Sequence, residues 1–170
     1  MAEEFIIDKS LPDWKKYEEF LSMIKNLLSR NDNSLSNLSN LTAAIKGTFE
    51  KISWAGFYLF DGSKLYLGPF QGKIACTTID LGKGVCGTSA LERKTVIVPD
   101  VDKFPGHIAC DSGSKSEIVV PIIKKGNSDS SLKEKLLGVL DLDSTSYNSF
   151  NETDKKYLEL LCAYLAEEIF

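Results

Sequence analysis

The feature that most constrains the fold is a pair of aromatic-rich segments, ISWAGFYLF at 52–60 and KLYLGPF at 64–70, joined through Asp61-Gly62. Hydrophobic runs on either side of an Asp-Gly turn are a strong hairpin signal, because glycine tolerates the positive φ that such turns need. The hairpin predicts an antiparallel sheet in the middle of the chain. Further strand-like runs lie at 73–79, 95–98, 117–123 and 136–142, and the polar residues 124–135 are expected to form a mobile, hairpin-like insertion.

Helical patterns occur on both sides of these strands. Apolar residues recur at helical spacing over 13–30 and 152–169, and a short helix is predicted near 85–93. Another helix is predicted from the apolar face made by Leu38, Leu41, Ile45 and Phe49. Strands joined partly by hairpins, with helices gathered at the chain ends, predict an α+β fold with a central antiparallel sheet. The 170 residues fit a single domain, 1–170, in which 1–12 form an N-terminal extension.

Charge and hydropathy exclude several classes of protein. The net charge is −4 and the basic residues are scattered, which argues against nucleic acid or an anionic membrane as a partner. No apolar stretch approaches the ~20 residues that a bilayer-spanning helix requires. The first residues, MAEEFIIDKS, lack the basic and apolar blocks of a secretion signal. We therefore expect a cytoplasmic protein, whose thiols are kept reduced.

The four cysteines differ in their surroundings. Cys110 lies in a polar segment rich in Gly and Ser, where a thiol is accessible and can be reactive. Cys86 lies in the Gly-rich stretch GKGVCG, which is either a tight turn or a movable arm, and Cys76 precedes it by ten residues. Cys162 lies within an apolar helix and is expected to be a core residue. Zinc bound by the first three cysteines and His107 is a weaker alternative, because structural zinc ligands usually come in close pairs.

Three acidic residues and two aromatic residues lie where a pocket would need them. Glu117 opens an otherwise apolar strand, and Asp141 and Asp143 alternate with leucines, which places both on one side of their strand. Neighbouring carboxylates repel, so one of them tends to hold its proton above its usual pKa. Such a pair could bind a substrate ammonium with one member and donate a proton with the other. Trp54 and Tyr58 also share a face, as core residues or as a pocket wall.

Several segments together resemble one enzyme family. NLTAAIKG, SWAGFY, LGPFQGKIAC, GKGVCGTSA, IVPDVDKFPGHIACDSGSKSEIVVP and LGVLDLDS are similar to segments of the free methionine-(R)-sulfoxide reductases. The resemblance runs from about residue 15 to the C-terminus, and the longer polar insertion at 124–135 is its main departure. It implies a GAF domain, in which a central antiparallel sheet is flanked by helices. A GAF sensor that only binds a ligand would not be expected to carry all three thiols together with the acids.

The resemblance also implies a role for each of the three thiols. Cys110 matches the catalytic cysteine, whose thiolate attacks the sulfoxide sulfur and becomes a sulfenic acid. Cys86 matches a resolving cysteine that forms a disulfide with it, and Cys76 matches an alternative or secondary resolving partner. Thioredoxin would then reduce the disulfide, with electrons from NADPH through thioredoxin reductase, and no cofactor or metal would be bound.

The acids and aromatic residues take roles from the same resemblance. Glu117, Asp141 and Asp143 match the acids that bind the substrate and assist loss of oxygen, with Asp143 favoured as the acid catalyst. Trp54 matches the aromatic wall that receives the terminal methyl group, and Tyr58 is its expected neighbour. A homodimer is expected only by analogy with GAF domains that pair through terminal helices. A GAF module that senses a small ligand or redox state remains the alternative.

Overall fold

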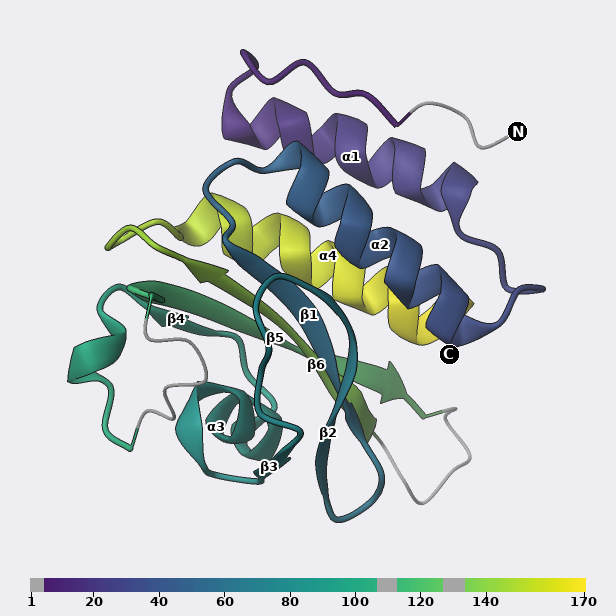
Figure 1. The fold of residues 1–170 in the computed structure, drawn as a ribbon. Coiled ribbons are helices and arrows are strands. Elements are labelled where there is room, and N and C mark those ends of the chain that lie inside the picture. The colour runs from purple at the N-terminus through teal and green to yellow at the C-terminus, as the bar shows by residue number, and fades with distance from the viewer. Residues whose placement is uncertain (1–4, 107–112, 127–133) are drawn as a thin grey trace.

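The computed structural model describes residues 5–106, 113–126 and 134–170. Along the chain, the described elements are α1 (Asp13–Leu27), α2 (Ser34–Thr48), β1 (Trp54–Phe60), β2 (Lys64–Gln71), β3 (Thr78–Asp80), α3 (Gly84–Glu92), β4 (Val96–Val98), the 3-10 turn η1 (Val101–Lys103), β5 (Ser116–Lys125), β6 (Glu134–Ser144) and α4 (Glu152–Glu168) (Figure 1). The helices predicted at the two chain ends and near 85–93 are thereby confirmed.

One antiparallel sheet organises the described part of the chain. Its strands lie in the order β3-β2-β1-β6-β5-β4, so β1, β6 and β5 are central. The predicted hairpin is present, with Tyr58 opposite Leu67 and Phe60 opposite Leu65. The α+β prediction of a central antiparallel sheet with flanking helices is confirmed.

The two faces of the sheet are covered differently. Helices α1, α2 and α4 form layers over one face, and the short α3 lies on the opposite side (Figure 1). In β5 the side chains of Ile118 and Val120 enter the core under the long helices, whereas Val119 enters a second core beside α3. This alternation is the period-two pattern of a strand buried on both faces. The central strands therefore present every second residue to the α3 side, which holds the candidate site.

Two segments that connect strands can be compared with the predictions made from the sequence. The strand predicted at 73–79 is found only as the three residues of β3, and the chain between Gly72 and Thr77 leaves the sheet. Gly72 has a φ of 135°, a backbone conformation that glycine adopts readily. The predicted insertion at 124–135 connects β5 to β6, and its residues 127–133 lie outside the described ranges.

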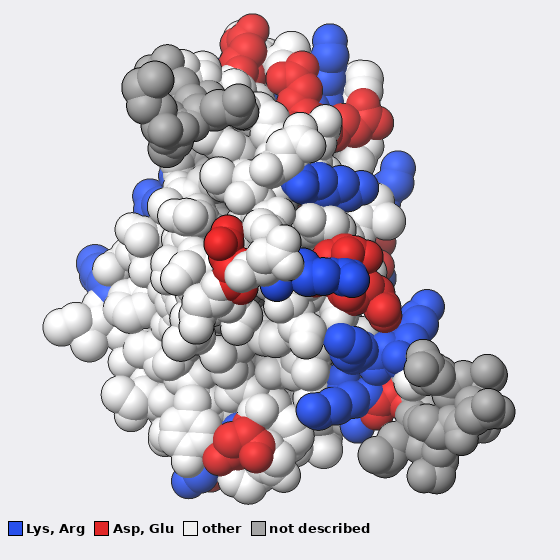
Figure 2. Space-filling model, turned by 90° about the vertical axis from the view of Figure 1, so that its right-hand side faces the viewer, with Lys and Arg blue, Asp and Glu red and all other residues white. Residues whose placement is uncertain are grey.

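The described helices and the face shown in Figure 2 can be compared with the hydropathy and charge of the sequence. Among the helices described here, none has the length and apolarity that crossing a bilayer would need. On the face in Figure 2, a broad uncharged area lies beside side chains of both signs. That mixture agrees with the scattered basic residues of the sequence.

Candidate active site

The candidate site lies on the α3 side of the three central strands. Strand register places Asp143 of β6 between Trp54 of β1 and Glu117 of β5. In the adjacent row, Asp141 has Gly56 of β1 as its partner. Asp141 and Asp143 point to the same side of β6, as the alternation in the sequence predicts, and they join Glu117 in one acidic surface.

Aromatic rings form a wall beside these acids. Trp54 and Tyr58 stack at a centroid distance of 6.2 Å, and Trp54 also stacks on Phe70 at 5.5 Å. The indole of Trp54 lies across Gly56, where an added Cβ would come within 2.3 Å of the ring. We call Trp54, Tyr58 and Phe70 the aromatic wall. Phe70 was not predicted as a site residue, and its pairing with Gly56 across the hairpin is the signal that could have indicated it.

Helix α3 brings Cys86 against the acids. Cys86 lies in the first turn of the helix, and only 4% of it is exposed. Gly87 follows it, and a Cβ at that position would lie 2.3 Å from the carbonyl oxygen of Asp80. The glycine therefore permits close packing of α3 onto the end of β3. In this structure the Gly-rich stretch is a packed helix start, which differs from the movable arm considered from the sequence.

Cys86, Glu117 and Asp141 form what we call the acid–thiol cluster, since one ligand atom from each lies within 4.8 Å of the others. Burial raises the pKa of Glu117 and of Asp141 well above the ordinary value, and the neighbouring carboxylates raise it further. Burial and the same carboxylates also raise the pKa of the Cys86 thiol. Burial therefore favours the protonated form of all three groups. One oxygen of Asp141, Oδ1, is buried and makes no hydrogen bond in the structure.

Asp143 differs from the two clustered acids. It is only half-buried, and Ser114 donates a hydrogen bond from Oγ to its Oδ1. The backbone of Ser53 holds the same residue from the other side, donating to the carbonyl oxygen of Asp143 at 2.8 Å. Ser114 was not predicted as a site residue. Its place in a polar segment shortly before Glu117 gives no pattern that would distinguish it from a surface serine.

The described cysteines are in different chemical states. Cys76 is half-buried and disulfide-bonded, whereas Cys86 and Cys162 carry buried free thiols. Cys162 packs in the core under the long helices, as predicted. Cys110 and His107 lie outside the described residues, so the structure gives no position for the predicted nucleophile or for the alternative four-ligand zinc set.

Among the described residues, the side chains of the acid–thiol cluster could also serve as ligands for a metal ion. A thiolate and two carboxylates are a donor set that Zn²⁺ accepts, with room for a further ligand. A metal ion would have to compete with protons, because burial favours the protonated form of all three groups. The cluster is therefore better suited to hold a proton than a metal ion.

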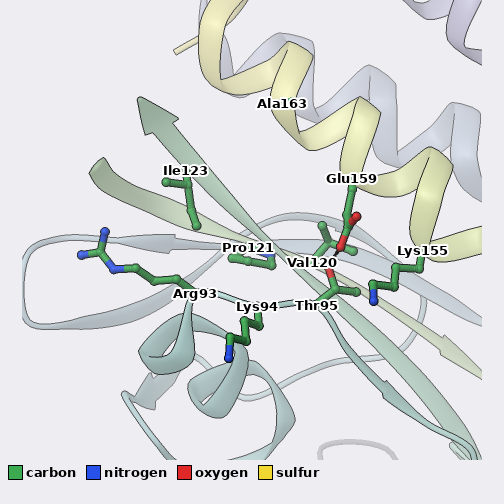
Figure 3. A pocket seen from close by; sticks show the side chains of 9 residues that line it. All are labelled: Arg93, Lys94, Thr95, Val120, Pro121, Ile123, Lys155, Glu159 and Ala163. Carbon is green, nitrogen blue, oxygen red and sulfur yellow. Dashed lines mark hydrogen bonds between the residues drawn. The ribbon is translucent and has the colours of Figure 1, made fainter. Parts of the chain in front are cut away.

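A separate cavity of about 380 Å³ lies between α4 and the outer part of the sheet (Figure 3). Its floor includes Val120 and Pro121, and Thr95 at its side donates a hydrogen bond to Glu159 Oε1 at 2.6 Å. The described residues that line it include none of the site residues predicted from the sequence. The acid–thiol cluster and the aromatic wall lie on the α3 side instead.

Comparison with known proteins identifies the family. A family model described as "GAF domain" matches residues 34–169. A free methionine-R-sulfoxide reductase of Saccharomyces cerevisiae is 47% identical over 151 residues, which cover 85% of this chain and 80% of the yeast protein. The chain belongs to the GAF-domain family of free methionine-R-sulfoxide reductases.

Two further relatives extend the likeness over nearly the whole chain. GAF domain-containing protein A of Dictyostelium discoideum is 52% identical over 159 residues, or 93% of this chain and 94% of that protein. The crystal structure of free methionine-R-sulfoxide reductase from Neisseria meningitidis, in complex with its substrate, superposes with a TM-score of 0.83 at 40% identity. That match covers 96% of this chain and 95% of the other, which confirms the resemblance and the GAF fold predicted from the sequence.

Proposed function

We propose that this protein is an oxidoreductase that reduces free L-methionine-(R)-sulfoxide to methionine. The observation that carries the proposal is the placement of the acid–thiol cluster and Asp143 directly beside the aromatic wall. The substrate has an ammonium at one end and a methyl sulfoxide at the other. Acids and aromatic rings on one sheet face suit those two ends.

The acids also account for a preference for the free amino acid. An ammonium group in a buried acidic site gains charge-assisted hydrogen bonds that an amide nitrogen cannot supply. A peptide-bound methionine sulfoxide has lost that charge and must also lead a chain out of the site. N-acetylated substrate should therefore react poorly, because acetylation removes the charge without changing the sulfoxide.

The proposed reaction begins at Cys110. Its thiolate attacks the sulfoxide sulfur, and the sulfur–oxygen bond of the substrate breaks. The oxygen ends as the hydroxyl of a sulfenic acid on Cys110, so methionine sulfur gains the two electrons that cysteine sulfur loses. Protonation of the departing oxygen assists this step, and the described acids lie where that proton can be held.

We assign the proton to the buried pair Glu117 and Asp141, and ammonium binding chiefly to Asp143. The raised pKa of both members of the pair favours their protonated forms, which suits a proton donor. Asp143 is half-buried and already accepts a hydrogen bond from Ser114, which suits a carboxylate that receives a cation. The sequence interpretation favoured Asp143 as the acid catalyst, and the burial of the other two favours exchanging these roles.

We further propose that Cys76 resolves the sulfenic acid. Its thiol would attack the sulfur of Cys110, forming a disulfide and releasing the oxygen as water. Cys76 is disulfide-bonded in the structure, which supports Cys76 over Cys86 as the resolving cysteine. Cys86 is buried with a raised thiol pKa, so it is a poor nucleophile and a better partner for Asp141.

Thioredoxin is the proposed reductant, and Ile74 is a suitable contact for it. This side chain is 89% exposed two residues before Cys76, and apolar contacts beside a disulfide favour docking of a protein dithiol. Replacing Ile74 by Asp should raise the KM for thioredoxin about tenfold. Turnover driven by dithiothreitol should stay unchanged, because a small reductant needs no docking surface. The matched control is Leu160→Asp on α4, also exposed, which should affect neither assay; equal KM values in both variants would reject this contact.

The activity itself can be tested with purified protein, thioredoxin, thioredoxin reductase and NADPH. We expect consumption of NADPH with the R epimer of free methionine sulfoxide, and little with the S epimer or with the N-acetylated R epimer. Addition of a chelator should leave the rate unchanged, because the proposed chemistry uses only thiols and carboxyl groups. Binding of the R epimer without turnover would support a sensor module instead.

A further inference from the structure

The segment that carries Cys76 is held by side chains of the aromatic wall. Between Gly72 and Thr77 the chain has no regular secondary structure. Trp54 donates a hydrogen bond from Nε1 to the carbonyl oxygen of Lys73 at 3.0 Å. Tyr58 donates one from its hydroxyl to the carbonyl oxygen of Cys76 itself at 3.1 Å. The residues expected to contact the substrate thus also contact the backbone of the disulfide-bonded cysteine.

Neither donor can move independently of this segment. Trp54 and Tyr58 are 3% and 1% exposed, and they stack on one another. A Cβ added to Gly72 would lie 2.5 Å from Cδ1 of Trp54, so the indole is confined by backbone at the start of the segment as well as by Gly56. Burial and the nearby Asp141 raise the pKa of Tyr58, which keeps its hydroxyl protonated and able to donate.

We propose that Tyr58 and Trp54 are positioning residues for Cys76, holding its segment at the wall of the substrate site so that a disulfide can form there. The inference rests on the proposed function, and it adds a second role to residues otherwise assigned to methyl-group binding. In this arrangement Tyr58 would contact the substrate with its ring and the Cys76 backbone with its hydroxyl. Disulfide formation would then take place close to the site where the sulfoxide is reduced. The backbone between Gly72 and Thr77 thus accepts hydrogen bonds from the aromatic wall, and it does not extend the pairing of β3 with β2.

The Tyr58 bond can be removed without removing the ring. Tyr58→Phe keeps the aromatic surface, and the KM for substrate is measured beside disulfide formation so that the two roles of Tyr58 are separated. Loss of one hydrogen bond to the Cys76 carbonyl should slow disulfide formation and shift the thiol–disulfide equilibrium toward the reduced form by roughly 3- to 10-fold each. Tyr66→Phe is the matched control, because Tyr66 lies on β2 with 40% of its surface exposed, and no change is expected there.

Two measurements test the inference. In the first, reduced protein is mixed with one equivalent of free methionine-(R)-sulfoxide, methionine is quantified, and loss of the Cys76 thiol is followed by alkylation and mass spectrometry. In the second, the disulfide is formed with diamide and equilibrated against dithiothreitol, which requires no turnover. The expected result for Tyr58→Phe is that thiol loss slows more than methionine release does, together with the shifted equilibrium. If Tyr58→Phe showed the same rates and the same equilibrium as the wild-type protein, the inference would be overturned. If the wild-type protein released no methionine, the proposed function would be rejected, and the second measurement alone would decide the role of Tyr58.

Discussion

Replacing Cys110 by Ser is expected to abolish methionine formation, with turnover falling at least ~1000-fold, because a hydroxyl does not ionise near neutral pH as a thiol can. Cys110 lies outside the described residues, so this expectation rests on the GHIACDS segment that resembles the family motif. Methionine released from the free R epimer, measured by chromatography with dithiothreitol as reductant, is the direct readout. Substantial product from Cys110→Ser would place the nucleophile at another cysteine.

Two companion variants separate the roles of the thiols. Cys76→Ser should release close to one methionine per chain and then stop with thioredoxin, because the sulfenic acid forms and is not resolved. Cys162→Ala is the control for loss of a thiol in general, since this residue is buried in the helix-side core. It should retain full activity and lower the free energy of unfolding by about 1 kcal/mol. Continuous thioredoxin-driven turnover by Cys76→Ser would instead return the resolving role to Cys86.

Local patterns in the sequence were sufficient to predict the antiparallel sheet and two pairs of residues that share one side of a strand. In β5, apolar residues at 118, 120 and 122 face the long helices, while Glu117 and Val119 face α3, as period-two alternation requires. The same rule placed Asp141 and Asp143 together, and Trp54 with Tyr58. These predictions succeed because alternation within one strand depends only on backbone geometry.

Contacts between distant segments were not predictable in the same way. The run at 73–79 has strand-like residues, but side chains from β1 bind its carbonyl oxygens, and pairing with β2 is limited to the last residues. Near Cys86, the glycines suggested mobility as readily as close packing. The position of Gly87 against the Asp80 carbonyl shows that packing is the reason, and nothing within GKGVCG distinguishes the two. In both cases a side chain or backbone segment from elsewhere in the chain contacts the backbone, and local sequence does not reveal that contact.

Replacing Asp141 by Asn should stabilise the protein at neutral pH while lowering kcat/KM about 100-fold. Because its folded-state pKa is raised, Asp141 keeps its proton when folded but releases it when unfolded, above the ordinary pKa of 3.8. Wild-type stability therefore falls as pH rises above that value, by up to about 1.4 kcal/mol per pH unit for one such acid, until the folded-state pKa is passed. Asp141→Asn removes this term, so its advantage over wild type, measured by urea unfolding, should be larger at pH 7 than at pH 5.

Asp154→Asn provides the opposite case with the same chemical change. Asp154 is fully buried, but it accepts hydrogen bonds from Tyr17 at 2.8 Å and from Lys51 at 2.6 Å. Loss of its charge leaves Lys51 without its buried partner, and we expect a loss of about 3 kcal/mol of stability with activity per folded molecule retained. The two substitutions thus distinguish an acid whose burial is compensated by a lysine within the protein from one that forms no ion pair among the described residues and is expected to hold a proton instead. An Asp141→Asn variant whose advantage is the same at pH 5 and pH 7 would show that this carboxyl does not hold the proton, and the proposed proton source for sulfoxide reduction would be lost.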